Sequence, residues 1–391
     1  MMKTFPVVVL TGARQTGKST LARQPEVGGG LYLTMDDVLV RDQAAREPWA
    51  LLGRADRLIL DEVQRVPDLL LSVKKAVDER REPGRFVLTG SADLLLWDGV
   101  SESLAGRAGY VTLWPLTRRE QLGLASPGVW GQLLEREPTT WRELLETQTA
   151  PEESWPDLAR RGGYPVPAHA LDSPSARQDW FDGYVATYLE RDLRQLSAVE
   201  NLADVRRLMT ALSMRAGGVF SQAEVARDLA VPTSSVHRYI NLLEVSYQIV
   251  RIPAFSVNRT KRLIKAPKLY WTDTGLALFL AGSPEPTGQH LENLIATDLL
   301  AWSSLRGGPV SILYWRTASG AEVDFVVETP GRVLPVEVKA AGRVATSDAR
   351  HLEIFLDEYS DLAQAGLLLY AGPETFWLTR RVLATPWWRV I

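Results

Sequence analysis

The sequence contains no cysteine among its 391 residues. Disulfides, thiolate metal sites and cysteine nucleophiles are therefore excluded, and we expect a protein of the reducing cytoplasm. Histidine is scarce as well: the four copies, at positions 169, 237, 290 and 351, include no pair four residues apart, which argues against a zinc-binding helix. No apolar run approaches the roughly 18 residues that a membrane span needs, so we expect no membrane partner.

A strong excess of one charge is also missing. The chain has 44 Lys and Arg against 47 Asp and Glu, a net charge of −3, so no global positive field attracts nucleic acid. Residues 201–275 differ, with 11 basic and 5 acidic side chains, and no acidic residue occurs between Glu244 and Asp273. This basic run contains Arg251, Arg259, Lys261, Arg262, Lys265 and Lys268. It predicts a local nucleic-acid contact, with an ordinary solvated surface as the alternative.

A phosphate-binding loop lies close to the start of the chain. Residues 5–11 read as a short buried strand, and GARQTGKS at residues 12–19 has the spacing G-x-x-x-x-G-K-[ST], followed by a short predicted helix. Lys18 is expected to reach the β- and γ-phosphates of ATP, and the Ser19 hydroxyl to bind Mg²⁺. Because the apolar run leads directly into this loop, we do not read it as a cleaved leader. The predicted nucleotide-binding residues are Gly12, Ala13, Arg14, Gln15, Thr16, Gly17, Lys18, Ser19 and Thr20.

Two further strand-like runs supply the other parts of a nucleotide hydrolase. The run at residues 58–60 ends in Asp61 and Glu62, which we expect to hold Mg²⁺ and to activate the attacking water, respectively. The run at residues 86–91 ends in polar side chains, of which Ser91 is the candidate for sensing the γ-phosphate or orienting water. Capping of a helix is the alternative role of the acidic pair.

These motifs resemble those of the AAA-type ATPases. In that family an arginine just before the fifth strand reaches the γ-phosphate of a neighbouring subunit, and Arg107 occupies the matching position. The resemblance therefore implies a homo-oligomer with an arginine finger that acts in trans, against the alternative of a surface salt bridge. The upstream helix that often helps to hold adenine is nearly absent, so either the start site is misassigned or base recognition is weak.

Residues 221–243 have the pattern of a helix-turn-helix. Two short amphipathic helices, at residues 221–229 and 233–243, flank Ala230-Val231-Pro232, and strands at 247–252 and 263–271 would form a wing around the basic run. The predicted nucleic-acid contacts, with DNA as the expected partner, are Ser234, Ser235, His237, Arg238, Arg259, Lys261, Arg262 and Lys265. The alternative is a winged helix that serves only as a packing module.

The C-terminal region carries a cluster of carboxylates and a lysine. The period of two along a strand places Glu337 and Lys339 on one face, and Asp324 can face them from the preceding strand. Glu292, on an earlier helix, is a fourth candidate, with Arg316 and Glu322 as supporting residues. We predict Mg²⁺ ligands in Glu292, Asp324 and Glu337, and a catalytic role for Asp324, Glu337 and Lys339. This pattern resembles the PD-(D/E)XK nuclease core, a fold that is also retained as a binding scaffold.

The order of motifs along the chain resembles one prokaryotic family of AAA-type ATPases. The segments GARQTGKST, LDEVQ, LTGS, SLAGR, GGYP and YLERD carry this likeness. The family has a C-terminal domain of unknown function with nuclease-like motifs. We therefore predict an α/β fold with a P-loop ATPase core at 1–125 built on a parallel sheet, a helical lid or linker at 126–200, a winged helix at 201–272 and an α/β nuclease-like domain at 273–391.

Three functions fit this sequence. The first is a Mg²⁺-dependent ATPase that couples nucleotide state to a DNA-binding winged helix and a nuclease. The second is a nucleotide-switched regulator that binds DNA or protein and has an inactive nuclease fold. The third, a P-loop kinase, is disfavoured because Asp61, Glu62 and Arg107 suit attack by water.

Overall fold

The computed structural model describes residues 1–25, 27, 29–90, 104–124, 126–149, 153–187, 201–283 and 285–391. These residues form two compact units, which are considered separately. Unit 1 comprises Met1–Trp114 with Val245–Gln248, and unit 2 comprises Pro115–Glu244 with Ile249–Ile391.

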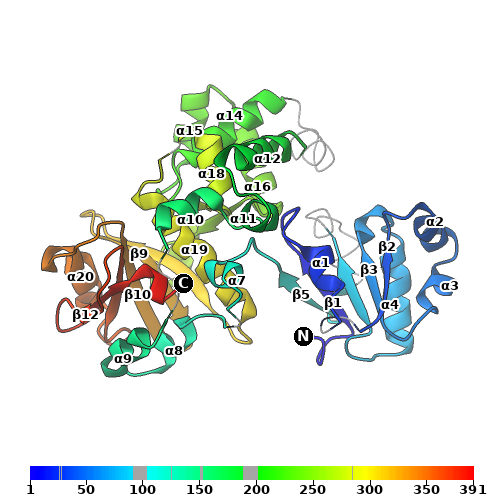
Figure 1. The fold of residues 1–391 in the computed structure, drawn as a ribbon, viewed down its shortest axis with the longest axis horizontal. Coiled ribbons are helices and arrows are strands. Elements are labelled where there is room, and N and C mark those ends of the chain that lie inside the picture. The colour runs from blue at the N-terminus through cyan, green and yellow to red at the C-terminus, as the bar shows by residue number, and fades with distance from the viewer. Residues whose placement is uncertain are drawn as a thin grey trace. The chain divides into compact units, whose positions relative to one another are not determined.

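Unit 1 is built on a five-stranded parallel sheet (Figure 1). The strand order is β2-β3-β4-β1-β5. Its elements are β1 (Val7–Thr11), α1 (Lys18–Ala22), β2 (Leu31–Thr34), α2 (Val38–Arg46), α3 (Pro48–Leu52), β3 (Leu58–Asp61), α4 (Leu69–Glu79), β4 (Phe86–Thr89) and β5 (Ala108–Thr112). Because all strands are parallel, their carboxyl ends meet at one edge of the sheet.

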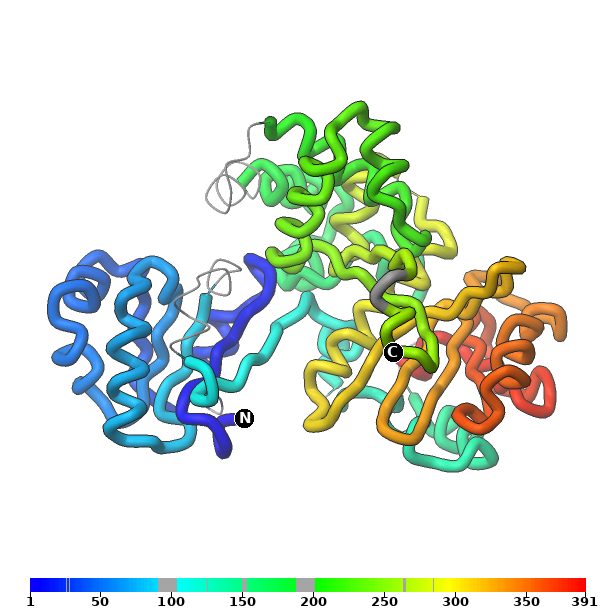
Figure 2. The backbone as a smooth tube through the Cα atoms, turned by 180° about the vertical axis from the view of Figure 1, so that it is seen from behind, coloured from blue at the N-terminus to red at the C-terminus, as the bar shows by residue number. Residues whose placement is uncertain are grey.

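Alternate residues of these strands face two different layers of helices. Val7 and Val9 pack in a cluster with α2, α3 and α4, which cover one face (Figures 1 and 2). Val8 and Leu10 pack instead with Ala22 of α1 on the other face. Burial of both faces explains why β1 and β3 read as continuous apolar runs and not as alternating ones. The predicted α/β fold with a parallel N-terminal sheet is therefore confirmed.

Unit 2 begins with a largely helical region, drawn in teal (α7 to α9) and green (α10 to α16) in Figure 1. Its helices are α7 (Arg118–Gln121), α8 (Trp130–Glu135), α9 (Trp141–Glu146), α10 (Trp155–Arg161), α11 (Pro165–His169), α12 (Pro174–Thr187), α14 (Leu202–Ser213), α15 (Gln222–Leu229) and α16 (Thr233–Val245). An antiparallel pair of strands follows, β6 (Ile249–Ile252) and β7 (Lys268–Trp271), with α17 (Arg259–Ile264) between them. The expected wing strand at 263–271 is thus wrong at its start, because Asn258 caps a helix there by accepting from the Thr260 N–H at 3.0 Å.

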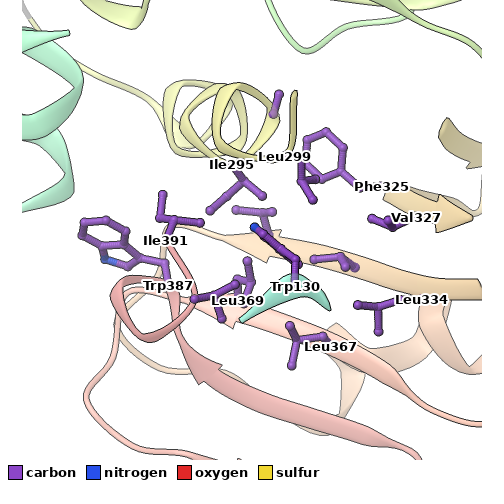
Figure 3. Close-up of a cluster of buried hydrophobic side chains, with 14 of the residues drawn as sticks. Trp130, Ile295, Leu299, Phe325, Val327, Leu334, Leu367, Leu369, Trp387 and Ile391 are labelled. Atoms are coloured by element: carbon purple, nitrogen blue, oxygen red, sulfur yellow. The ribbon is translucent and has the colours of Figure 1, made fainter. Parts of the chain in front are cut away.

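The rest of unit 2 is a six-stranded mixed sheet between helices. The strand order is β12-β13-β11-β10-β9-β8. Its elements are α18 (Thr274–Ala281), α19 (Gly288–Leu305), β8 (Ser311–Arg316), β9 (Glu322–Thr329), β10 (Arg332–Lys339), α20 (Arg350–Glu358), β11 (Gly366–Tyr370), β12 (Phe376–Trp377) and β13 (Val382–Pro386). Figure 3 shows Ile295 and Leu299 of α19 directed at the sheet residues, with Trp130 of α8 in the same cluster. Helix α20 belongs to a second cluster, which includes Val326 and Leu368 of the sheet.

The GGYP segment is fixed by a buried carboxylate. Asp273, which is 2% exposed, accepts hydrogen bonds from the backbone N–H groups of Gly163 at 2.6 Å and Tyr164 at 3.1 Å. Gly162 has a φ of +71°, and a Cβ there would lie 2.5 Å from Asp273 Oδ1. The segment therefore has a structural role in the described chain, whereas YLERD lies outside the described residues.

One buried acid makes the stability of unit 2 depend on pH. Asp298 is 5% exposed, and its Oδ2 accepts from Trp130 Nε1 at 2.7 Å. Burial raises the pKa of Asp298 to about 7, although the Trp130 hydrogen bond and the charges of Arg119 and Arg118 act against this rise. The unfolded chain releases this proton near pH 4 and the folded chain only near pH 7, so the free energy of unfolding falls across that interval.

Asp298→Asn is expected to remove this pH dependence while it keeps an acceptor for Trp130. Between pH 5 and pH 8 the free energy of unfolding of the wild type should fall by about 3 kcal/mol more than that of the variant, since one pKa unit corresponds to about 1.4 kcal/mol and about two units lie between pH 5 and the folded pKa. Urea unfolding at both pH values measures the difference, with the exposed Asp172→Asn as control. Equal pH slopes for wild type and Asp298→Asn would contradict the assignment.

Candidate functional site

The phosphate-binding loop connects β1 to α1. Its backbone takes positive φ at Gly12 (+135°), Gln15 (+61°) and Gly17 (+94°). A Cβ at Gly12 would lie 2.2 Å from the carbonyl oxygen of Leu113, so only glycine fits. Thr16 Oγ1 donates to the Ala13 carbonyl at 2.9 Å, a hydrogen bond that stabilises the loop. The sequence therefore folds here into a tight turn whose N–H groups can bind phosphate oxygens.

Lys18 is held against this loop. Its side chain is 7% exposed, and its Nζ donates to the carbonyl oxygens of Gly12 at 3.0 Å and Ala13 at 2.6 Å. The ammonium group is thereby fixed beside the backbone that would contact a polyphosphate. A cation at this position neutralises phosphate charge.

Asp61 forms the centre of the site at the carboxyl edge of the sheet. It ends β3, is 3% exposed, and accepts from Ser19 Oγ at 2.9 Å and from Tyr32 Oη at 2.5 Å. Thr89 Oγ1 also donates to this carboxylate. The structure therefore brings together the two predicted Mg²⁺ ligands, Ser19 and Asp61. A hydroxyl and a carboxylate are hard oxygen ligands that suit this ion.

Glu62 follows Asp61 in a left-handed backbone conformation, with a φ of +57°. Its backbone N–H donates to Thr89 Oγ1 at 3.3 Å, and its Oε2 accepts from Gln64 Nε2 at 2.5 Å. A non-glycine residue in this conformation carries backbone strain, which the neighbouring contacts compensate. The turn therefore gives the two carboxylates different partners: Asp61 accepts from Ser19, and Glu62 accepts from Gln64.

Two residues of this site, Thr89 and Tyr32, are missing from the sequence prediction. Thr89 lies at the end of β4, between β3 and β1, and Tyr32 lies on the neighbouring β2. Both follow from strand order, which no local motif reveals. The polar end of β4 is the available signal, but the sequence prediction places the role on Ser91, which lies outside the described residues.

Arg107 is engaged within its own unit. Its guanidinium donates to both carboxylate oxygens of Asp78 on α4, at 2.6 and 2.9 Å. This ion pair is solvent-exposed, so its contribution to stability is small and it can open at little cost.

The predicted nucleic-acid residues of unit 2 divide into two groups. Arg262 is tied into the fold, because its guanidinium donates to Glu328 of β9 at 2.5 and 2.9 Å and to the Ser256 carbonyl at 2.6 Å. His237, although exposed, lies 3.3 Å from Gln222 Oε1 and 3.0 Å from Asn241 Nδ2. The remaining predicted residues are exposed or half-buried: Ser234, Ser235, Arg238, Arg259, Lys261 and Lys265.

The C-terminal carboxylates surround a lysine that the sequence prediction did not assign to them. Lys268 of β7 is 1% exposed, and its Nζ lies 2.9 Å from Glu292 Oε1, 2.6 Å from Glu322 Oε1 and 3.2 Å from Asp324 Oδ1. Burial lowers the pKa of Lys268, but the charges of Asp324, Glu292 and Glu322 outweigh this effect and raise it overall. The ammonium is therefore charged. We call these four residues the Lys268 cluster.

Glu337 and Lys339 lie beside the Lys268 cluster. Lys339 Nζ donates to Glu337 Oε1 at 2.7 Å, and Asp324 Oδ2 accepts from the backbone N–H of Val338 at 2.9 Å. Glu337 is 4% exposed, and its Oε2 has no hydrogen-bond partner. Burial, followed by the nearby charge of Asp324, raises the pKa of Glu337. The structure thus gathers Glu292, Asp324, Glu337 and Lys339 as expected, but with an additional cation.

The arrangement does not fit a divalent metal as it stands. Over the described ranges, no three His, Asp or Glu side chains are placed to hold a metal ion. The position between Glu292, Glu322 and Asp324 is taken by the Lys268 ammonium. The predicted Mg²⁺ site of a nuclease therefore stays a prediction, and Arg316, expected to support it, lies 3.6 Å from Glu322 at the exposed side.

Models of known protein families match three segments of the chain. The family described as AAA domain matches residues 4–122, and the domains of unknown function DUF8612 and DUF4143 match residues 152–287 and 287–390. The uncharacterized proteins Rv2008c of Mycobacterium tuberculosis and Mb2031c of Mycobacterium bovis are each 32% identical over 394 residues, which cover 97% of this chain and 80% of theirs.

A search of solved structures gives a fainter likeness. The Bacillus subtilis DNA clamp loader delta protein (YqeN) is 15% identical with a TM-score of 0.24, covering 76% of this chain and 95% of that chain. A TM-score this low carries no information on function. Among the described helices, none is long and apolar enough to cross a membrane.

Proposed function

The chain belongs to the same family as the two mycobacterial proteins and carries an N-terminal AAA domain and a C-terminal DUF4143 domain, and from this premise we propose that it binds and hydrolyses ATP with Mg²⁺. The observation that carries the proposal is the 2.9 Å contact between Ser19 of the phosphate-binding loop and Asp61 at the end of β3. An AAA domain alone implies nucleotide binding. This pair of oxygen ligands beside Lys18 adds a reason for metal-assisted hydrolysis.

The chemistry of each residue follows from its position. Bound MgATP supplies the phosphoryl centre and the charge of its metal. The N–H groups of the loop at residues 12–20 hold the phosphates, and Lys18 neutralises their charge. Ser19 and Asp61 hold the metal, with Thr89 and Tyr32 fixing the Asp61 carboxylate. Glu62 accepts the proton of the attacking water, for which Ser91 is the proposed orienting residue.

Lys18→Ala and Glu62→Gln should separate binding from hydrolysis. Lys18→Ala removes the phosphate-binding cation and should abolish ATP binding, whereas Glu62→Gln should retain ATP and lower turnover at least about 100-fold, the usual contribution of a general base. Calorimetric ATP titration and phosphate release measure the two effects. The exposed Glu79→Gln serves as a matched control for loss of a carboxylate. Normal turnover in either site variant would contradict the proposed site.

Arg107 is proposed to act on the γ-phosphate of a neighbouring subunit. The proposal rests on its position before β5 and on the exposed pair with Asp78, which opens at little cost. An arginine that approaches the phosphoryl oxygens stabilises the charge of the transition state. The active form is then a homo-oligomer with shared sites.

Mixing of two inactive variants tests the shared site. Arg107→Ala subunits keep an intact loop, and Lys18→Ala subunits keep an intact arginine, so a mixed oligomer should recover part of the ATPase activity. Phosphate release is measured over a range of mixing ratios, and mixed assembly is checked by co-purification of differently tagged subunits. Mixed oligomers without any recovery would contradict action in trans.

The helices α14, α15 and α16 with the β6–β7 pair are proposed to form a DNA-binding winged helix. The sequence order of three helices followed by an antiparallel strand pair supports this, as do the exposed cations Arg259, Lys261 and Lys265. Ser234, Ser235, His237 and Arg238 near the start of α16 would contact bases, and the cations would contact phosphates. Arg262 is excluded from this role by its pairing with Glu328.

Replacement of the three exposed cations should weaken DNA binding. The triple variant of Arg259, Lys261 and Lys265 to alanine loses about three phosphate contacts. The plot of log affinity against log salt concentration should therefore become less steep, with a slope smaller in magnitude by roughly three. Fluorescence anisotropy with a duplex oligonucleotide measures the slope. A charge-matched triple variant of Lys3, Arg54 and Arg57 in unit 1 is the control. The same loss of affinity in both variants would contradict a specific DNA-binding face.

For the C-terminal domain we favour a binding function without cleavage. The observation that favours it is the Lys268 ammonium between the carboxylates that nuclease chemistry would need for a metal. The chain is then an ATP-switched regulator that binds DNA, with a nuclease-like fold retained as a scaffold. Glu337 and Lys339 stabilise each other in this function and have no catalytic role.

A further inference from the structure

Three carboxylate oxygens converge on a single point inside unit 2. They come from α19 (Glu292) and β9 (Glu322 and Asp324), and the Nζ atom of Lys268 lies within 3.2 Å of all three. An ammonium group has three N–H donors, so this set of acceptors satisfies it completely. The cation of the cluster is therefore part of the protein chain.

The backbone holds Lys268 at this point. Strand β7 pairs with β6, where Lys268 lies opposite Ile252, and its other side forms a bridge with Val219. Two residues farther along, Tyr270 Oη donates to Glu292 at 2.5 Å and fixes the same carboxylate that Lys268 contacts. The backbone of Lys268 is therefore fixed on a paired strand, which places its side chain at the cluster.

The same oxygen atoms are the hard ligands that divalent cations prefer. Buried carboxylates require a counter-charge, and either an ammonium group or a metal ion can provide it. Glu337 adds a buried oxygen, Oε2, which has no hydrogen-bond partner and lies close enough to Asp324 for the two charges to interact. The cluster therefore contains oxygen atoms that could bind a metal ion, together with a lysine whose ammonium group occupies the position of that ion.

We propose that the Lys268 cluster is a latent divalent-cation site in which Lys268 takes the place of the metal, so that the C-terminal domain of the wild type works without one. A tethered ammonium competes at high effective concentration with any free ion. Removal of the lysine then exposes a site for Mn²⁺ or Mg²⁺ formed by Glu292, Glu322 and Asp324. The inference concerns unit 2 alone and does not depend on the proposed ATPase activity.

The test compares Mn²⁺ binding by the full-length, nucleotide-free chain with and without Lys268. Free Mn²⁺ is measured by electron paramagnetic resonance during titration at pH 8. The variants are Lys268→Met, Asp324→Asn and the double variant Lys268→Met/Asp324→Asn, with Lys3→Met as a control for loss of a lysine. All variants share the same phosphate-binding loop, so weak binding of Mn²⁺ there cancels in the comparison.

We expect Lys268→Met to bind one more Mn²⁺ per chain than the wild type, and the double variant to lose this ion. Lys3→Met and Asp324→Asn should bind as the wild type does. Mn²⁺ bound by the wild type but lost in Asp324→Asn would overturn the proposal, because the metal would then bind with the lysine present. A folded Lys268→Met chain with no additional ion would also overturn it.

Lys268→Met leaves partly buried carboxylates without a counter-charge, so its folding is followed by circular dichroism at each Mn²⁺ concentration. If the variant is unfolded without metal, Mn²⁺ should restore the wild-type spectrum, and it should fail to do so in the double variant. A Lys268→Met chain that stays unfolded at every Mn²⁺ concentration would show that a divalent ion cannot replace the ammonium, and would overturn the proposal.

Discussion

The burial of Asp61 is the constraint on which the nucleotide site depends. A carboxylate that is 3% exposed must be hydrogen-bonded, and its donors come from α1, β2 and β4, each of which places one hydroxyl at the carboxyl edge of the sheet. The parallel strand order makes this convergence possible, because β4 lies between the strand that precedes the phosphate-binding loop and the strand that ends in Asp61. Ser19 and Lys18 then lie on the same short helix, so the loop, the cation and the carboxylate are positioned together.

The same physical requirement has a different outcome in unit 2. There the partly buried carboxylates Glu292, Glu322 and Asp324 obtain a counter-charge from Lys268, and the Tyr270 hydroxyl adds a hydrogen bond to Glu292. A hydroxyl can turn away from a carboxylate and offer an oxygen to a metal, whereas an ammonium occupies the metal's position. This difference is why we propose nucleotide hydrolysis for unit 1 and a non-cleaving function for the C-terminal domain.

The sequence predicts the features that depend on residues close together in the chain, and it does not predict those that depend on distant residues. The phosphate-binding loop is predictable because its glycines, Lys18 and Ser19 are contiguous, and the parallel sheet because its strands are continuous apolar runs. Thr89 and Tyr32 are not predicted because they contact Asp61 from other strands, and no local motif reveals the order of the strands in the sheet. Lys268 and Arg262 appear in the sequence as members of one basic run, but their acidic partners lie 24 to 66 residues away. Only the fold therefore shows that both form ion pairs within unit 2.

The central proposal is that this chain hydrolyses ATP and does not cut DNA. The most direct measurement follows phosphate release and nicking of supercoiled plasmid in the same reaction, with purified wild-type protein, ATP and Mg²⁺ or Mn²⁺, and with EDTA as the metal-free control. The account predicts phosphate release that EDTA abolishes, while the plasmid stays supercoiled with either metal. Metal-dependent nicking, or the absence of phosphate release from a folded protein that binds the plasmid, would contradict it.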